Sequence, residues 1–233
     1  MGSHDIVQGT NCPIQDEGNN IIAQACYQIA KEFDIEPYDE HTGKGVLRHI
    51  IGRIGQSGWM IILVTATEQL PHKEKWVEKL TERIPQVETI VHNVNGKRTN
   101  VILGPKNNIL YGDGTITDHI KDLQFTLSPH SFFQVNPEQT TVLYDQALAY
   151  ADLKGDETVI DAYCGTGTIS LFLAHKAKHV IGIEIVEPAI INARENARRN
   201  GYENTEFIVA DAAVEMPKLY KAGVRPDVIV FDP

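Results

Sequence analysis

The stretch TVIDAYCGTGT, residues 158–168, decides the fold class of this 233-residue chain. Its first five residues form a short apolar run, which is typical of a buried strand. Gly165 and Gly167 follow directly, as expected where a strand turns tightly into a helix. Glycines at such a turn let a ligand approach the backbone, and the N-terminus of the following helix presents free N–H groups. The stretch therefore predicts a ligand-binding loop at the carboxyl end of a buried strand.

Further apolar strands follow this loop, and helical stretches separate them. We expect strands at 158–162, 179–183, 205–209 and 227–231, with helices at about 167–176, 187–200 and 212–221. Buried strands that alternate with helices indicate a parallel, doubly wound sheet. Pro137 is expected to open one more helix, which extends to about Tyr150. Its apolar face is predicted to consist of Val142, Leu143, Ala147 and Leu148.

The residues before this sheet follow a different pattern. Helices are expected at 19–33 and 72–84, and strands at 46–54, 59–66 and 88–94. Gly55–Gly58 is a hairpin-like connection, so we expect an α+β layer with antiparallel pairing. Residues 99–128 are less regular. The chain thus divides into an expected α+β domain over 1–128 and an α/β domain over 129–233.

Composition excludes several classes of protein. No apolar run approaches the roughly 18 residues of a membrane-spanning helix, and the N-terminus lacks the pattern of a signal peptide. The three cysteines, Cys12, Cys26 and Cys164, are too few and too scattered for a disulfide framework or a zinc site, which indicates a cytoplasmic protein without a metal. A net charge of −10 argues against broad non-specific binding of nucleic acid, but it permits a local basic strip.

Acidic residues stand at or just after the ends of the four predicted parallel strands: Asp161, Glu184, Asp211 and Asp232. Glu184 lies about 20 residues after the glycine loop, where a ribose-binding acid is expected. When each acid is considered alone, a solvated surface charge or a helix cap is the alternative to a role in ligand binding. NAD and S-adenosylmethionine compete for such a site. Ser170 replaces the third glycine of the dinucleotide pattern, and the four acids favour the cationic sulfonium cofactor.

Residues 128–137, SPHSFFQVNP, combine with the glycine loop, Glu184, Asp211 and the final Phe231-Asp232-Pro233 into a distinctive set. This set resembles the RNA uracil-5-methyltransferases, and most closely the bacterial 23S ribosomal RNA enzymes. Residues 4–7 and 11–15 also resemble the middle region of that family. The resemblance implies a Rossmann-like S-adenosylmethionine methyltransferase core with an incomplete parallel sheet, preceded by an α+β middle domain that faces RNA.

The resemblance also implies roles for individual residues. The cofactor site would be lined by Gln134, Tyr163, Gly165, Gly167, Thr168, Glu184, Asp211 and Asp232. The target uracil would contact Phe132, Gln134 and Asp232, although core packing remains the alternative for at least one of Phe132 and Phe133. In this family a cysteine thiolate adds to C6 of uracil, so that C5 can attack the methyl group, and a general base then removes the C5 proton.

The chain departs from the family after the shared Asp232-Pro233. Relatives continue into the nucleophilic cysteine and a glutamate base, whereas this sequence stops at Pro233. We therefore expect a fragment that has no catalytic residue of its own and that also lacks the family's N-terminal RNA-binding barrel. Cys12 resembles one ligand of an iron–sulfur cluster in some relatives, but one cysteine cannot hold a cluster. An exposed edge at the fourth strand would favour a dimer.

A candidate RNA face lies in the first half and comprises Arg48, His49, Arg53, Lys97 and Arg98. Arg48 and His49 have opposite strand parity, so they are not expected to share one face. Alternative functions are a transfer-RNA uracil methyltransferase, a methyltransferase with another target, and a non-catalytic domain that binds RNA or a partner. Affinity for the cofactor would separate the last of these from the enzymes.

Overall fold

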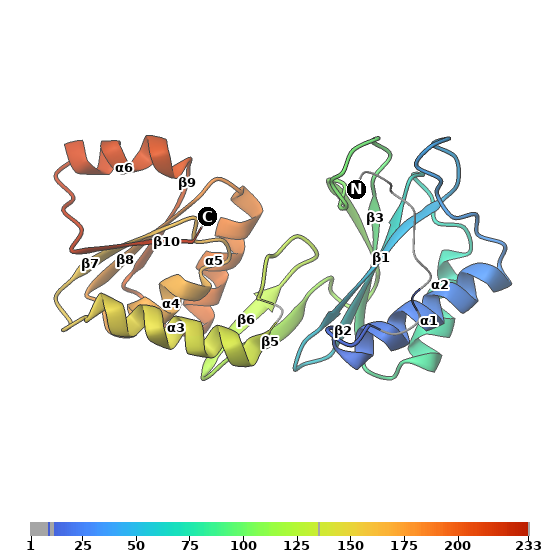
Figure 1. Ribbon diagram of the computed structural model, residues 1–233, viewed down its shortest axis with the longest axis horizontal. Helices are drawn as coiled ribbons and strands as arrows, with labels where there is room; N and C mark the ends of the chain where they lie inside the picture. Colours follow the sequence, from blue (N-terminus) through green and yellow to red (C-terminus); the bar gives the residue numbers. More distant parts are fainter. Residues whose placement is uncertain (1–8, 10–11, 135, 233) are drawn as a thin grey trace. The chain divides into compact units, whose positions relative to one another are not determined.

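The structure is a computed structural model that describes residue 9, residues 12–134 and residues 136–232. It contains two compact units, residues 1–116 and residues 117–233, each of which is described by itself (Figure 1). The predicted motif at residues 4–7, together with Asn11, Val135 and Pro233, lies outside the described residues.

Unit 1 is a mixed sheet with two helices. Its elements are α1 (Glu17–Glu32), β1 (Leu47–Ile54), β2 (Trp59–Thr65), α2 (Lys73–Arg83), β3 (Val87–Val94) and β4 (Lys106–Tyr111). The strand order is β1-β2-β3-β4. The hairpin between β1 and β2 is confirmed as antiparallel, but β2 and β3 are parallel. Purely antiparallel pairing was therefore a wrong expectation, because α2 returns the chain across the sheet before β3 begins.

Both helices of unit 1 contribute to one apolar core. Ile22, Cys26 and Ile29 recur at helical spacing on α1, and all three are buried. They belong to the same cluster as Trp76 and Leu80 of α2 and as alternate residues of β2. The apolar residues that recur at helical spacing and those that recur along the strands therefore meet in one core, which packs both helices on the sheet.

Unit 2 contains the predicted parallel sheet. Its elements are β5 (Ile116–Ile120), β6 (Leu123–Leu127), α3 (Pro137–Ala151), β7 (Thr158–Ala162), α4 (Thr168–Ala174), β8 (His179–Glu184), α5 (Glu187–Arg199), β9 (Thr205–Val209), α6 (Ala212–Lys221) and β10 (Val228–Phe231). The strand order is β10-β7-β8-β9, and all pairs are parallel. In Figure 1, α6 lies on one side of the sheet and α3 and α4 lie on the other, as expected for a doubly wound sheet.

The hairpin of β5 and β6 belongs to unit 2. Asn196 and Asn200 of α5 accept hydrogen bonds from the backbone N–H groups of Thr126 and Gln124, both at 2.9 Å. Asn200 also donates to the carbonyl of Gln124 at 2.7 Å. These side chains form hydrogen bonds with backbone groups along one edge of the hairpin and so join it to unit 2. The two units therefore divide after Ile116, whereas the sequence suggested a boundary after residue 128.

Helix α3 has a different buried face from the predicted one. Val142 and Leu143 are 60% and 54% exposed, whereas Tyr144 is 3% exposed. The ring of Tyr144 packs edge-on against Phe172 of α4, with 5.1 Å between the ring centroids. The prediction failed because it selected aliphatic residues, while an aromatic ring makes the contact with α4.

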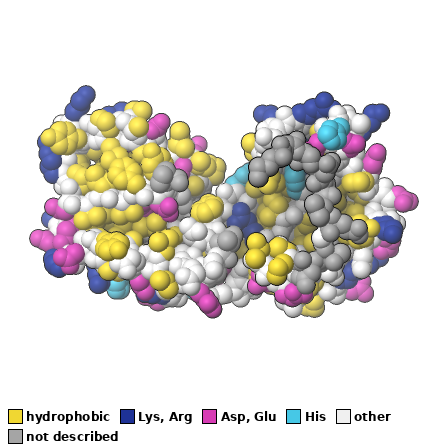
Figure 2. All heavy atoms as spheres, viewed as in Figure 1, with side chains coloured by type: hydrophobic (Ala, Val, Ile, Leu, Met, Phe, Trp, Pro, Cys, Tyr) yellow, Lys and Arg dark blue, Asp and Glu magenta, His cyan; other side chains and the backbone are white. Residues whose placement is uncertain are grey.

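Strand β10 forms an edge of the described sheet, where its only strand partner is β7. Ile229 and Phe231 are 41% and 59% exposed on this strand. Figure 2 shows hydrophobic side chains gathered on the visible face of unit 2. The sheet thus ends in a strand whose apolar side chains and backbone groups are available for pairing with another chain.

Candidate functional site

A cavity of about 380 Å³ lies at the carboxyl end of β7, within unit 2. It is lined by Phe132, Phe133, Gln134, Tyr144, Asp161, Tyr163, Cys164, Gly165, Thr166, Thr168, Ile169, Glu184 and Asp232. Its size lies within the range of small-molecule sites. The structure therefore brings together all the predicted site residues except Asp211 and Gly167.

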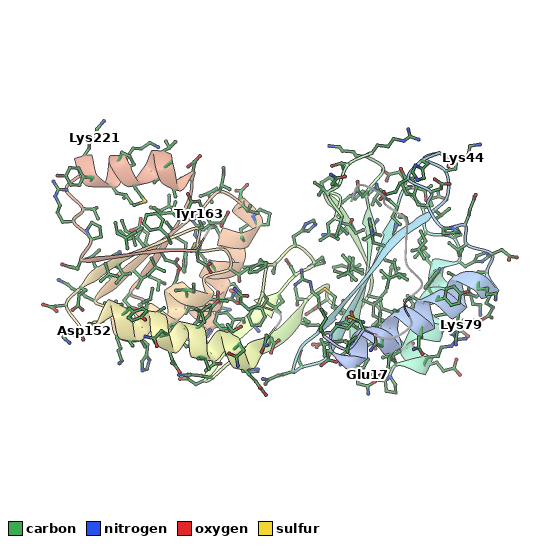
Figure 3. All side chains as sticks on the ribbon, in the orientation of Figure 1. Glu17, Lys44, Lys79, Asp152, Tyr163 and Lys221 are labelled. Atoms are coloured by element: carbon green, nitrogen blue, oxygen red, sulfur yellow. The ribbon has the colours of Figure 1, made fainter. Side chains whose placement is uncertain are left out.

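The loop after β7 owes its shape to left-handed backbone conformations. The φ angles of Tyr163, Gly165 and Gly167 are 67°, 55° and 81°. A Cβ on Gly167 would lie 3.1 Å from the Cβ of Ala193, whereas one on Gly165 would meet no atom within 4 Å. Gly167 thus allows close packing beneath the loop, and Gly165 leaves open space beside the cavity. Tyr163, labelled in Figure 3, adopts a strained conformation for a residue with a Cβ.

Glu184 is held in place at the end of β8 by the backbone. Its Oε2 accepts a hydrogen bond from the N–H of Gly165 at 3.2 Å, and its Oε1 accepts one from the N–H of Val186 at 2.8 Å. Each carboxylate oxygen can accept more than one hydrogen bond. The fixed carboxylate can therefore still accept bonds from two neighbouring hydroxyl groups of a ligand.

Asp161 is the buried acid of the site, with 1% of the residue exposed. Ser170 donates its hydroxyl to Oδ2 at 2.5 Å, while Oδ1 has no hydrogen-bond partner among the described residues. Burial raises the pKa of Asp161 to about 7, and the nearby carboxylates of Asp232 and Glu184 contribute in the same direction. A ligand with a positive charge would stabilise this acidic cavity.

Aromatic side chains form another part of the wall. The hydroxyl groups of Tyr144 and Thr168 are 3.0 Å apart and share a hydrogen bond. Burial raises the pKa of Tyr144, which keeps its hydroxyl protonated. Sequence reasoning missed Tyr144, because its burial and its contact with Phe172 arise from the packing of α3 on α4.

The two phenylalanines of residues 128–137 differ in their surroundings. Phe132 is 72% exposed at the cavity. Phe133 packs against the buried Phe125 of β6, with 5.9 Å between ring centroids. Core packing therefore explains part of the role of Phe133, while Phe132 is free to contact a ligand.

Asp211 and Gly167 do not line the cavity. The carboxylate of Asp211 caps α6 by accepting a hydrogen bond from the N–H of Ala213 at 2.8 Å. Asp211 therefore acts as a helix cap, which is one of the roles other than ligand binding that the sequence left open for each acid. Gly167 lies at the start of α4 and acts through packing.

None of the three cysteines has the surroundings of an activated nucleophile. Cys164 lines the cavity, but burial raises its pKa and so disfavours the thiolate. Cys26 is buried in the core of unit 1, where burial raises its pKa to about 12. Cys12, in unit 1, is half-buried, and all three thiols are free. The described residues also contain no cluster of three or more metal-ligating side chains.

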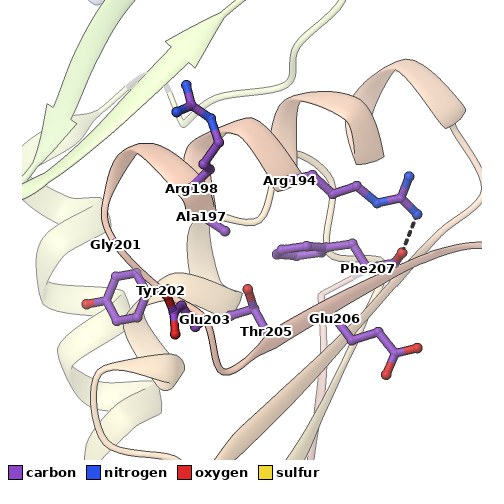
Figure 4. A pocket seen from close by; sticks show the side chains of 9 residues that line it. All are labelled: Arg194, Ala197, Arg198, Gly201, Tyr202, Glu203, Thr205, Glu206 and Phe207. Carbon is purple, nitrogen blue, oxygen red and sulfur yellow. Dashed lines mark hydrogen bonds between the residues drawn. The ribbon is translucent and has the colours of Figure 1, made fainter.

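A larger cavity, of about 570 Å³, lies between α5 and β9 (Figure 4). Arg194 reaches across it and donates to the carbonyl of Phe207 at 2.6 Å. Its basic residues, Arg194 and Arg198, come from α5, and its acidic residues, Glu203 and Glu206, come from the following loop and β9. It has neither the glycine loop nor converging carboxylates, so we assign the functional site to the smaller cavity.

The predicted fold class is confirmed: the chain has a mixed α/β structure with a Rossmann-like S-adenosylmethionine methyltransferase fold. Residues 153–232 match a family model described as a methyltransferase domain. The chain is 52% identical over 233 residues to an uncharacterised RNA methyltransferase of Halalkalibacterium halodurans, covering 99% of this chain and 51% of the relative. It is 50% identical over 235 residues to an uncharacterised RNA methyltransferase of Bacillus cereus, with 100% and 51% covered. Both relatives are named as RNA methyltransferases, and this chain covers about half of each.

Several solved structures match this chain, and one of them covers nearly all of it. It is the tRNA (uracil-54, C5)-methyltransferase of Pyrococcus abyssi in complex with S-adenosyl-L-homocysteine. The TM-score is 0.78 at 25% sequence identity, with 98% of this chain and 54% of that chain covered. The chain thus spans about half the length of the proteins it matches. No helix of the described residues is long and apolar enough to cross a membrane.

Proposed function

We propose that the chain supplies the cofactor site of an RNA methyltransferase that modifies C5 of uracil. The observation that carries this proposal is the convergence of Asp161, Glu184 and Asp232 on one cavity beside the glycine loop. Three carboxylates at the carboxyl ends of parallel strands suit a ligand that is both cationic and rich in hydroxyl groups. The methyltransferase fold and the ligand named for the archaeal structure imply that this ligand is S-adenosylmethionine.

The cavity can be divided among the parts of that cofactor. Glu184, which the backbone holds at the end of β8, would accept the ribose hydroxyl groups. The unpartnered Oδ1 of Asp161 would face the ammonium group of the amino-acid part. Asp211 would contact the adenine edge, if the cofactor extends beyond the cavity to the end of β9. The loop glycines Gly165 and Gly167 would shape the floor, as the conformation of the loop allows.

The uracil would lie at the mouth of the cavity. The exposed ring of Phe132 supplies a stacking surface for a base that has left its stack. Gln134 and Asp232 line the same cavity and can bind the polar edge of the base. The aromatic hydroxyl of Tyr144 is already bonded to Thr168, so it organises the wall instead.

The chemistry requires a thiolate, which we place outside these 233 residues. A thiolate would add to C6 of uracil, C5 would take the methyl group from the sulfonium, a base would remove the C5 proton, and the thiolate would leave. Cys164 is the only cysteine that lines the cavity, and its raised pKa opposes this role. Free cysteines and an RNA substrate together favour a cytoplasmic setting.

The RNA class has two candidates. The residues of the 128–137 segment favour 23S ribosomal RNA, through the resemblance on which the proposal partly rests. Transfer RNA is the second candidate, because the archaeal neighbour is named as a tRNA methyltransferase. Methyl transfer to separated ribosomal and transfer RNA would distinguish the two.

Calorimetric titration of the chain with S-adenosylhomocysteine tests the cofactor site, with NAD as the matched control. We expect binding of the homocysteine compound alone. Failure to bind by a chain that is folded according to circular dichroism would contradict the proposed site. To test the uracil chemistry, the chain would be extended with the segment of the Halalkalibacterium relative that follows the matched region. Formation of 5-methyluridine in RNA is expected, and methylation at any other atom would refute that part of the proposal.

A further inference from the structure

Two loops of unit 1 bring a group of cationic side chains together at one end of this unit. Lys97 and Arg98 belong to the loop between β3 and β4, and Lys44 belongs to the loop before β1. All three residues are exposed. We propose that this group, here called the basic edge, binds the phosphate backbone of the RNA substrate. The inference rests on the proposed function, which makes RNA the substrate.

Arg48 determines the position of the first of these loops. Its Nη1 donates to the carbonyl oxygens of Asn95 and Lys97, both at 2.7 Å, and its Nη2 donates to that of Thr99 at 3.5 Å. The guanidinium also lies 4.6 Å from the centre of the Tyr38 ring. Arg48 was predicted as an RNA contact, but its Nη1 and Nη2 groups donate to carbonyl oxygens within the protein. It is a positioning residue that presents Lys97 and Arg98.

The backbone at Arg48 also bears on the expectation that Arg48 and His49 lie on opposite faces of the strand. The register of β1 against β2 shifts between Leu47 and His49, so Arg48 lies at a bulge. A bulge interrupts the alternation of side chains along a strand. The relative directions of Arg48 and His49 therefore do not follow from their sequence spacing.

The second loop brings Gly43, which precedes Lys44, against the side chain of Arg98. The N–H of Asp39 donates to the carbonyl of Lys44 at 2.8 Å, and the N–H of Gly43 donates to the carbonyl of Asp39 at 2.7 Å. A Cβ on Gly43 would lie 2.2 Å from Nη2 of Arg98, so the guanidinium rests against bare backbone. The absence of a side chain at Gly43 thus lets the two loops share one surface.

Several cations elsewhere in unit 1 are paired with acids. Lys75, Lys79, Arg83 and Lys106 form ion pairs with glutamates. Among the described residues, the side chains of Lys44, Lys97 and Arg98 have no such partner. Asp39 of the same loop has its carboxylate engaged by the N–H groups of His41 and Thr42, at 2.7 and 3.0 Å. Figure 2 shows the dark blue Lys and Arg side chains at this end of unit 1, where Figure 3 labels Lys44.

Unpaired cations on an ordered loop suit a phosphate backbone. Asn95 adds to the order by donating to the carbonyl oxygens of Val101 and Ile102, at 2.7 and 2.9 Å. A loop that is already held in place loses less conformational freedom when it binds. Phosphate contacts position a nucleic acid without reading its sequence. The basic edge would therefore bind RNA in a salt-dependent manner, in a chain whose net charge of −10 otherwise repels it.

Fluorescence anisotropy with a labelled, uracil-containing single-stranded RNA tests this inference. The test variant combines Lys44→Ala, Lys97→Ala and Arg98→Ala. The matched control combines Lys75→Ala, Lys176→Ala and Lys221→Ala, which removes the same charge from other exposed positions. We expect the test variant to bind at least about tenfold more weakly at low salt, with the slope of log affinity against log salt reduced by about 2, since each single-strand phosphate contact contributes about 0.7. The control should change affinity less than about threefold.

Several results would overturn the proposal. Equal losses in the two triple variants would indicate a general charge effect, and unchanged affinity in the test variant would exclude the basic edge. Tighter binding of polyglutamate than of RNA would point to an acidic protein partner instead.

The variant Arg48→Lys tests the positioning role of Arg48. It keeps the positive charge but loses the fork of donors, so it should weaken RNA binding while thermal unfolding stays cooperative.

The same proteins should be titrated with S-adenosylhomocysteine. We expect the test variant to bind this compound as the unmodified chain does, because the basic edge lies in unit 1 and the cofactor cavity in unit 2. Cofactor binding without any RNA binding would refute the basic edge and leave the cofactor site intact. RNA binding that depends on the basic edge, without cofactor binding, would contradict the proposed function and leave the surface in place.

Discussion

Asp161 should make the affinity of the proposed site for its cofactor depend on pH. Its carboxyl group is buried and its pKa is raised to about 7, so the free protein is half protonated near neutrality. The ammonium group of S-adenosylhomocysteine favours the carboxylate form. Binding therefore requires loss of the proton, and affinity should fall as the pH falls below 7.

The size of this effect follows from the pKa. If bound cofactor lowers the pKa of Asp161 below about 5, the affinity should be about 25-fold weaker at pH 5.5 than at pH 7.5. The ligand keeps the charges of its amino-acid part over this range. Asp161→Asn removes the titrating group but keeps an acceptor for the hydroxyl of Ser170, so its affinity should be weaker and nearly independent of pH.

Isothermal titration at the two pH values measures this directly, and buffers of different ionisation enthalpy would reveal the released proton. Glu82→Gln, at an exposed position of α2, is the control for a change of charge. A flat pH profile in the unmodified chain would refute the role of Asp161. So would an Asp161→Asn variant that retained the full pH dependence.

Four further predictions concern individual features of unit 2. Glu184→Ala should weaken cofactor binding by about 1–3 kcal/mol in calorimetry, because two hydroxyl acceptors and the support of the loop are lost; unchanged affinity would contradict the ribose assignment. Gly167→Ala should lower the midpoint of thermal unfolding more than Gly165→Ala, since a Cβ meets neighbouring atoms only at the former; equal losses would count against the packing argument. Asp211→Ala should destabilise the chain by about 1 kcal/mol through loss of the cap, whereas Asp211→Ser keeps a cap but is too short to reach adenine; full affinity in the serine variant would exclude the adenine contact. The exposed edge at β10 predicts a dimer in light scattering, and a monomer at all concentrations would count against it.

The parallel sheet of unit 2 was predictable because its central strands, β7 and β8, are buried almost throughout and because its outer strands are also apolar runs. Strands of this kind appear as continuous apolar runs, and the residues that follow them must lie at one edge. Glu184 and Asp232 could therefore be placed in the same site from their positions alone. The close packing under Gly167 also agrees with a glycine at the start of α4.

Features that depend on contacts between distant segments were not predictable. Tyr144 joins the cavity because α3 packs on α4, and the parallel pairing of β2 with β3 depends on the path of α2 across the sheet. Asp211 lies at a strand end like the other acids, yet its carboxylate caps the next helix. Sequence spacing does not distinguish a cap from a ligand contact, because both need an acid at the same position.

The sequence by itself determined the layout of unit 2, the glycine loop and the set of acids, since these depend on local periodicity and on the direction of parallel strands. Only the tertiary structure decided how each side chain is used. It buried Asp161 with one oxygen unpartnered, and it directed the donors of Arg48 to the carbonyl oxygens of the loop between β3 and β4. The physical reason is that burial and hydrogen bonding arise from segments far apart in the chain, whose meeting is not encoded in any short motif.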